Sequence, residues 1–214
     1  MGRLLMPARV YPPGTDNSVP WRGYIYNSAI YSDDHGRTWK TSDPFPILGT
    51  GEGTLAELAD GTIYYNSRKH MPGTDRRRIA WSSDGGASWR NASIDDNLYD
   101  GGGFGRGYGN AAGLVRLPLE WTEGKNVLLF SNTDTQGGER EKMTVWASFD
   151  QGKSWPVKRL VYEGPAAYSS LAVGRPGTPS DGLIFLQFEG GPEGMYSAIQ
   201  LARFNLAWLT ESSE

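Results

Sequence analysis

The residue types that most often carry out enzyme chemistry are scarce in this sequence. The 214 residues include two histidines, His35 and His70, and no cysteine. Without cysteine there is no thiol nucleophile, no cysteine-ligated zinc and no disulfide framework. Two histidines, one of them within a turn motif, argue against a Ser-His-Asp triad or a histidine-rich metal site. We therefore predict a protein without a bound metal.

Two segments resemble nucleotide-binding loops but fail at a required position. In the glycine-rich segment 100–110 only the alanine-ended dinucleotide fingerprint fits, from Gly107 to Ala112, and no helix-like segment follows. Residues 151–154, QGKS, resemble the end of a phosphate-binding loop, but Ala147 stands where glycine is required. We expect no nucleotide cofactor, and we predict that the glycine-rich segment is a surface loop.

Charge and hydrophobicity exclude further classes of partner. The formal charge of -3 provides no basic field for nucleic acid, so none is expected as a partner. No stretch approaches the roughly 18 consecutive apolar residues of a membrane span, and no signal-like segment opens the chain. The sequon at residues 91–93 is a short pattern that also occurs by chance.

The elements that must position any site are marked by a repeated octet, Ser-x-Asp-x-Gly-x-(Thr/Ser)-Trp. It occurs at residues 32–39, 82–89 and 148–155, named here octets 1, 2 and 3. Each octet follows a run rich in β-forming residues and therefore joins two strands. Aspartate accepts hydrogen bonds from turn amides, glycine tolerates φ > 0, and tryptophan covers the hairpin. We predict that Asp34 braces such a turn rather than contacting a substrate.

The spacing of these signals predicts an all-β fold. The chain is rich in Gly (29), Trp (8) and Tyr (11), and an Asp-Gly hairpin pattern lies at residues 57–68. Successive octets begin 50 and then 66 residues apart, which is the scale of a four-stranded unit. We predict one incomplete β-propeller domain of about four blades, with approximate bounds 1–45, 46–95, 96–160 and 161–214.

The octets resemble the Asp boxes, or BNR repeats, on the six-bladed propeller of the sialidases (exo-α-neuraminidases). Single-copy segments strengthen this resemblance: GPAAYSSL at residues 164–171 is similar to the family's G-P-x-x-Y-S-x-L. Residues 51–61 are similar to N/D-E-x-Q followed by E-L-x-D-G, although Gly51 and Thr54 replace the Asn/Asp and the Gln. Further similar segments are N66-S67-R68, S131-N132 followed by Arg140, and F185-L186-Q187-F188-E189.

The resemblance implies a retaining glycoside hydrolase that removes terminal sialic acid from glycoconjugates. Tyr168 would be the nucleophile, because a neutral phenol avoids repulsion by the substrate carboxylate, and Glu52 would be its base. Arg68 and Arg140 would bind that carboxylate, and Glu189 would orient the first arginine of the family's triad. Sialylated glycans or free sialic acid are the implied partners, no cofactor is expected, and the family resemblance favours a secreted or periplasmic protein.

Two family features are not recognisable in the chain. These are the arginine of an (F/Y)-R-I-P segment and the aspartate that serves as general acid/base. Arg9 follows alanine and is expected in a different blade. The chain thus resembles the last four of six blades, and we expect very poor hydrolysis by this chain alone. Unpaired strands at the open ends of the arc also favour self-association.

Other interpretations of the same residues stay open. The chain could be a noncatalytic Asp-box propeller that binds glycans or proteins, in which case Tyr168, Arg68 and Arg140 would not converge. It could also act on a different acidic sugar. Tyr168 could be a packing residue, Glu57 competes with Glu52, and the basic cluster could be a solvated face. That cluster consists of Arg68, Lys69, Arg76, Arg77 and Arg78.

Overall fold

The computed structural model describes residues 2–10, 26–70, 74–102, 109–136 and 138–211, and the expected all-β fold is confirmed over these residues. The first seven strands are β1 (Leu4–Val10), β2 (Tyr26–Ser32), β3 (Lys40–Thr41), β4 (Thr50–Glu57), β5 (Ile63–Lys69), β6 (Arg76–Ser82) and β7 (Arg90–Tyr99). The others are β8 (Gly113–Arg116), β9 (Leu128–Thr133), β10 (Glu141–Ser148), β11 (Val157–Val173), β12 (Ile184–Gly190) and β13 (Ile199–Phe204). A 3₁₀ turn at Leu119–Trp121 and the helix α1 (Leu206–Thr210) complete the described elements.

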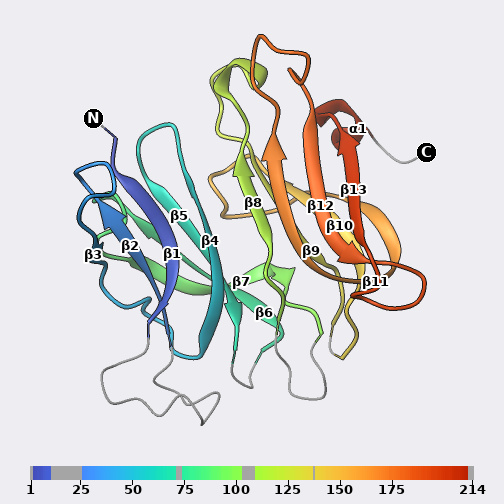
Figure 1. Cartoon of the computed structure of the whole chain (residues 1–214), viewed down its shortest axis with the longest axis horizontal. Coiled ribbons are helices and arrows are strands. Elements are labelled where there is room, and N and C mark those ends of the chain that lie inside the picture. Colours follow the sequence, from blue (N-terminus) through green and yellow to red (C-terminus); the bar gives the residue numbers. More distant parts are fainter. Residues whose placement is uncertain (1, 11–25, 71–73, 103–108, 137, 212–214) are drawn as a thin grey trace.

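Consecutive strands pair antiparallel in three hydrogen-bonded sheets, in the orders β1-β2-β3, β4-β5-β6-β7 and β8 to β13 (Figure 1). The third sheet turns a corner within β11, which is 17 residues long. The first part of β11 pairs with β10 as far as Glu141 opposite Pro165, and the second part pairs with β12 from Ala166 opposite Gly190. One strand therefore ends one unit and begins the next.

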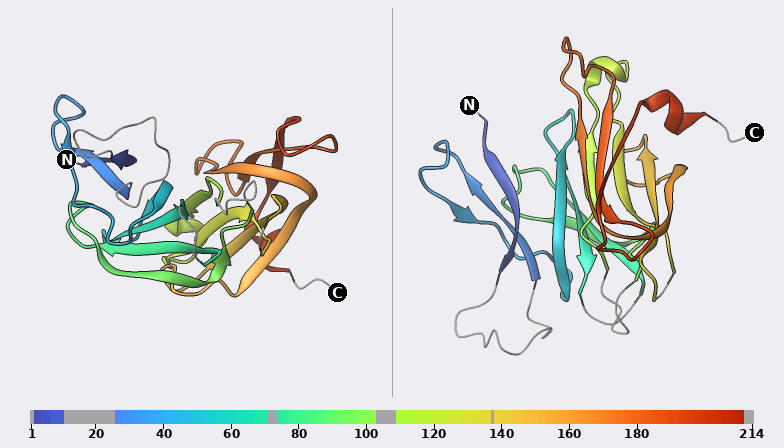
Figure 2. Two further views of the ribbon diagram at one scale, coloured as in Figure 1. Left: turned by 90° about the horizontal axis from the view of Figure 1, so that it is seen from below. Right: turned by 45° about the vertical axis from the view of Figure 1, so that its right-hand side comes forward.

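The strands are arranged as an arc around an open side (Figure 2). The innermost strands contact one another in the order β1, β4, β8 and β11. We propose that the groups β1–β3, β4–β7, β8 to early β11, and late β11 to β13 are the four blades predicted from the sequence. This grouping puts the ends of the inner strands, where Glu52 and Tyr168 lie, around a common axis.

The octets form the same turn in all three copies. In octet 1 the Asp34 carboxylate accepts hydrogen bonds from the backbone N–H of Thr38 (2.8 Å) and from its hydroxyl (2.6 Å). Ser32 Oγ donates to Asp34 (2.8 Å) and accepts from the N–H of Gly36 (2.8 Å). Octets 2 and 3 repeat these four contacts. The fifth-position glycines adopt φ between +83° and +84°, a region that glycine enters without strain.

Hydrogen bonds within the octets stabilise the charged aspartate. Donation by the Thr38 hydroxyl and amide lowers the pKa of Asp34 from 3.8 to about 2. For Asp84 burial acts in the opposite direction, but bonds from Ser88 and Ser82 outweigh it and also lower the pKa to about 2. The octet aspartates therefore brace turns, as the sequence predicts.

The octets also join neighbouring groups of strands. The tryptophan of octet 2, Trp89, lies in the hydrophobic cluster between the first two groups, and Trp155 of octet 3 lies in the cluster between the second and third. These rings are 7% and 4% exposed. Trp39 of octet 1 faces the outer flank of the first group and is 41% exposed. The same motif is therefore a bridge between groups in two copies and a surface feature in the third.

Candidate functional site

Glu52 and Arg68 lie on adjacent antiparallel strands, β4 and β5. The pairing register of these strands shifts between Thr50 and Gly53, so β4 bulges at Glu52. A bulge redirects a side chain out of the regular alternation of a strand. Arg68 comes near the end of β5, and its side chain is 5% exposed. The two side chains form an ion pair at the rim of the sheet.

Tyr168 comes from the second part of β11, more than a hundred residues later in the chain. The register against β12 also shifts here, between Ala166 and Ser169, so this strand bulges at the tyrosine. Arg68 Nη1 donates a hydrogen bond to Tyr168 Oη at 2.6 Å, and Tyr168 Oη donates to Glu52 Oε1 at 3.2 Å. Three side chains from three strands therefore meet at one phenolic oxygen.

Arg140 approaches the same tyrosine from the segment before β10. Its guanidinium carbon lies 5.6 Å from the centre of the Tyr168 ring, and that of Arg68 lies 5.7 Å from it. Arg140 Nη1 donates to Tyr196 Oη (2.7 Å), while Nη2 and Nε donate to the carbonyls of Gly109 (2.9 Å) and Gly102 (3.1 Å). Two guanidinium groups, both largely buried, thus flank one phenol.

Glu189 lies next to the site and contacts the backbone of the tyrosine. Its Oε2 accepts a hydrogen bond from the backbone N–H of Tyr168 at 3.2 Å. Within the described part of the chain it forms no ion pair with an arginine. In this structure Glu189 fixes the bulge that carries the tyrosine.

Arg9 is a site residue that the sequence reasoning missed. Its Nη2 lies 3.4 Å from Glu52 Oε1, so the expectation that Arg9 falls in the wrong blade does not exclude it from the cluster. Arg9 lies near the end of β1, which runs from Leu4 to Val10. Because the ends of inner strands ring the axis, the full length of β1 would have indicated this residue.

The glycines on either side of Glu52 make room for two aromatic side chains. A Cβ at Gly51 would lie 2.4 Å from His70 Nδ1, and one at Gly53 would lie 2.4 Å from the hydroxyl of Tyr65. His70 is 2% exposed, and burial together with the charges of Arg68 and Arg9 lowers its pKa to about 3. His70 is therefore a neutral packing residue beside the site, and its packing explains why position 51 is glycine.

A buried carboxylate supports both arginines of the cluster. Asp100 pairs with Arg77 at 2.8 Å, both side chains being 0% exposed. Asp100 also accepts hydrogen bonds from the backbone N–H of Lys69, next to Arg68, and of Asn110 (3.0 Å), next to the Gly109 carbonyl that binds Arg140. The glycine-rich segment expected at the surface is therefore buried at both described ends, and residues 103–108 lie outside the described residues.

The interpretation of the basic cluster as a solvated face is wrong. Its members Arg68, Lys69, Arg77 and Arg78 are all buried. Lys69 of β5 pairs with Asp75, and Arg77 of β6 pairs with Asp100, so these two cations have carboxylate partners rather than facing water. Glu57, the sequence competitor of Glu52, is exposed at the other end of β4.

The electrostatics of the cluster favour a protonated tyrosine with a base at hand. Burial raises the pKa of Tyr168, and the Glu52 charge adds to this, while Arg68 and Arg140 oppose it. A protonated phenol is a weak nucleophile, so the acceptor at 3.2 Å is the group that could take its proton. Two fixed arginines whose guanidinium carbons lie 5.7 and 5.6 Å from the centre of the ring could bind a carboxylate through paired N–H groups.

Over the described ranges, no group of three or more histidine, aspartate or glutamate side chains is placed to hold a metal ion. The described helices also include none that is long and apolar enough to cross a membrane.

Comparison with known proteins identifies the group to which the chain is related. The BNR repeat-like domain family matches residues 2–180. A sialidase from Micromonospora viridifaciens is 35% identical over 184 residues, which are 85% of this chain and 25% of that protein. The chain belongs to the sialidase family that carries BNR repeats. A sialidase of Vibrio cholerae is 28% identical over 198 residues, covering 79% of this chain and 23% of its own length.

Solved structures of sialidases share the fold. A Hadza microbial sialidase superposes with a TM-score of 0.70 at 27% identity, over 87% of this chain and 33% of that one. The intramolecular trans-sialidase from Ruminococcus gnavus gives a TM-score of 0.68 at 20% identity, which supports the fold alone. An incomplete sialidase-type propeller, expected from the sequence, is thereby confirmed. The chain spans about a quarter of the length of the two bacterial relatives.

Proposed function

We propose that this chain carries the nucleophile side of a retaining sialidase site. The observation that carries the proposal is the convergence of Glu52, Arg68 and Tyr168 on one phenolic oxygen from strands far apart in sequence. Arg68 and Arg140 would bind the carboxylate of a terminal sialic acid, and sialylated glycans would be the substrates. The rival proposal, a noncatalytic propeller, requires that these side chains do not converge, and the geometry favours the catalytic proposal over it.

The proposed reaction has two steps. In the first, Tyr168 Oη forms a bond to the anomeric carbon, its proton passes to Glu52, and the bond to the leaving oxygen breaks. In the second, water attacks the same carbon, the bond to Tyr168 breaks, and Glu52 returns its proton to the phenolate, while the proton that the water loses passes to solvent. The leaving oxygen needs a proton in the first step, and no residue of this chain has been assigned to supply it. Without a general acid the rate is expected to fall by ~10²–10⁴.

A fluorinated reagent tests the nucleophile without requiring a general acid. With 2,3-difluorosialic acid the carbon–fluorine bond at the anomeric centre breaks, and fluoride leaves without being protonated. We expect intact-protein and peptide mass spectrometry to find one sialyl group on Tyr168 while ordinary sialosides are turned over poorly. Tyr168→Phe should abolish labelling, and Tyr162→Phe, on the same strand but packed against Phe188, should retain it.

The outcome that would contradict the proposal is a folded wild-type chain that stays unlabelled at saturating reagent. Labelling at a residue other than Tyr168 would contradict the assigned nucleophile. If the Glu52→Gln variant is labelled as fast as the wild type, the assignment of Glu52 as the base is contradicted.

A further inference from the structure

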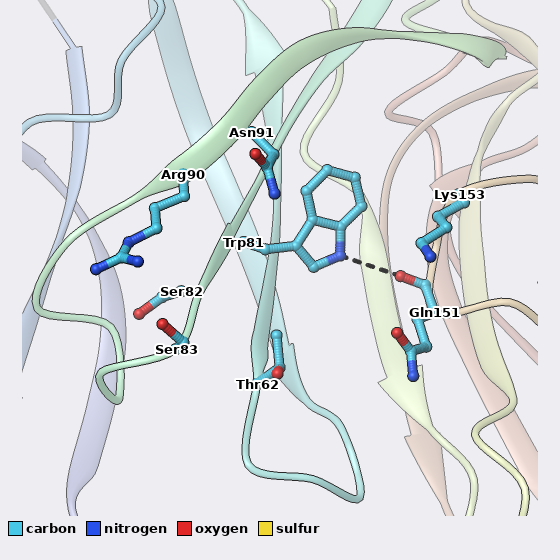
Figure 3. A pocket seen from close by; sticks show the side chains of 8 residues that line it. All are labelled: Thr62, Trp81, Ser82, Ser83, Arg90, Asn91, Gln151 and Lys153. Carbon is cyan, nitrogen blue, oxygen red and sulfur yellow. Dashed lines mark hydrogen bonds between the residues drawn. The ribbon is translucent and has the colours of Figure 1, made fainter.

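A cavity separate from the Tyr168 cluster lies at the end of the sheets where the octets are. Its volume is about 470 Å³, and it opens between octet 2, the start of β7, and octet 3. Trp81, Arg90 and Asn91 from one group of strands and Gln151 and Lys153 from the next line it (Figure 3). Apolar cavities with a few directed polar groups are the usual form of a ligand site.

The strand register places this cavity away from the tyrosine cluster. Ser82, where octet 2 begins, pairs with Ile63 at the start of β5. Arg68 lies at the other end of β5, and Lys69, beside it, pairs with Thr50 at the start of β4. The two sites therefore occupy opposite ends of the same strands, and the cavity is independent of the proposed catalytic function.

Trp81 provides a fixed aromatic wall. Its indole Nε1 donates a hydrogen bond to the backbone carbonyl of Gln151 at 3.2 Å, and its ring packs against Tyr64 with centroids 5.4 Å apart. Figure 3 shows the ring between Arg90 and Lys153, with this hydrogen bond to octet 3. A ring held in this way offers an apolar surface to the C–H face of a sugar without losing side-chain entropy on binding.

The polar groups around this wall are cationic. Arg90 and Lys153 lie on opposite sides of Trp81, and over the described residues neither side chain has a hydrogen-bond or ion-pair partner. The nearby octet carboxylates are occupied, because Asp84 binds Ser82 and Ser88. Asp150 is likewise bound to Ser148 and Ser154. In the described part of the chain, the cavity therefore presents two cationic side chains that form no ion pair, beside an aromatic platform.

Asn91 adds a neutral hydrogen-bonding group between these charges. It adopts φ of +53°, an uncommon conformation for a residue other than glycine, at the point where β7 begins. Its amide lies close above the indole in Figure 3. We propose that this cavity binds a saccharide that carries a carboxylate, with the sugar ring against Trp81, the acid group at one of the two flanking cations, Lys153 or Arg90, and hydroxyl groups at Asn91.

The test follows the indole N–H signal of Trp81 in ¹⁵N–¹H NMR spectra of the Tyr168→Phe variant. This substitution removes the proposed nucleophile and so prevents turnover at the other site. The signal is assigned by its loss in Trp81→Phe. Titration with 3′-sialyllactose, with a hyaluronan tetrasaccharide and with neutral lactose separates sialic acid, uronic acid and uncharged sugar. We expect a saturable shift with at least one of the two acidic sugars and none with lactose.

One double variant, at two exposed positions, and one matched control complete the test. Arg90→Ala with Lys153→Ala should weaken binding about tenfold or more, because charge-assisted hydrogen bonds to the carboxylate are lost. Arg37 holds the position in octet 1 that Lys153 holds in octet 3, but it lies outside the cavity. Arg37→Ala should therefore leave the affinity unchanged. No shift with either acidic sugar, an equal shift with lactose, or unchanged binding in the double variant would overturn the proposal.

Discussion

Asp100 supports both Arg68 and Arg140, the two arginines of the candidate site. It is fully buried with Arg77, and it holds the backbone next to Arg68 and next to the carbonyl that binds Arg140. Arg77 also donates to Asn66 (2.7 Å) and to the carbonyl of Asn110 (2.7 Å). Because both charges are removed from water, each depends on the other for compensation.

We predict that removing both charges of this pair costs less than the sum of the costs of removing each one alone. Asp100→Asn and Arg77→Gln should each lower the free energy of unfolding by about 3 kcal/mol, because each leaves an uncompensated buried charge or its unmet hydrogen bonds. The double variant should lose clearly less than the sum of the two. Urea unfolding of the four proteins measures this, and additive losses would contradict the coupling.

Single residues also show where sequence reasoning succeeds and where it fails. Tyr168, Glu52 and Arg68 stand within short motifs, so their neighbours in sequence indicate them, and Arg140 is indicated by its spacing from S131-N132. Arg9 and His70 were missed because their positions depend on strand pairing and on the space left by Gly51, which no local pattern encodes. Glu189 was found, but its contact with the Tyr168 backbone depends on the bulge in β11.

At the scale of elements, the octet is a turn that also fixes neighbouring groups of strands. The glycine of octet 2 packs against Leu5 of β1, where a Cβ would lie 2.6 Å from the leucine side chain. The glycine of octet 3 packs against Tyr64 of β5, where a Cβ would lie 2.7 Å from the ring. The sequence pattern predicts the turn because its bonds are local. Packing against the preceding group is a tertiary effect that the pattern alone does not contain.

We predict that Asp84→Asn destabilises the chain by about 1 kcal/mol at neutral pH, a modest amount because the side chain is exposed and screened by solvent. The folded pKa of Asp84 is lowered from 3.8 to about 2, so its contribution is complete above the unfolded value and disappears as the pH falls through the folded value. Urea unfolding should therefore show a difference between wild type and variant that shrinks between pH 4 and pH 2.

A matched control distinguishes the loss of the octet hydrogen bonds from the loss of a surface charge. Asp96→Asn removes an exposed carboxylate from β7, outside the octets, and should change stability little at either pH. A constant difference between wild type and Asp84→Asn across the acid range would show that the carboxylate does not brace the turn.

At the scale of the whole molecule, the arc leaves the outer flank of its first group of strands exposed. Leu4 and Met6 of β1 are each 45% exposed, and Trp39 of octet 1 is 41% exposed. Leu4 and Trp39 both pack against Gly36, so they belong to one apolar surface. The equivalent tryptophans of octets 2 and 3 are covered by a neighbouring group, so this surface has the composition of an interface between blades.

We predict that the chain self-associates through this flank, because burial of large apolar side chains is favourable at roughly 25 cal/mol per Å² and β1 is an unpaired edge strand. Sedimentation velocity should show a concentration-dependent dimer or larger species. Leu4→Lys with Met6→Lys should shift it toward monomer, since two charges would have to be desolvated at the contact. Ile94→Lys, at an exposed hydrophobic residue of β7 away from this flank, should leave association unchanged. A wild-type chain that stays monomeric as its concentration rises would contradict the prediction, and so would association that persists in the double lysine variant.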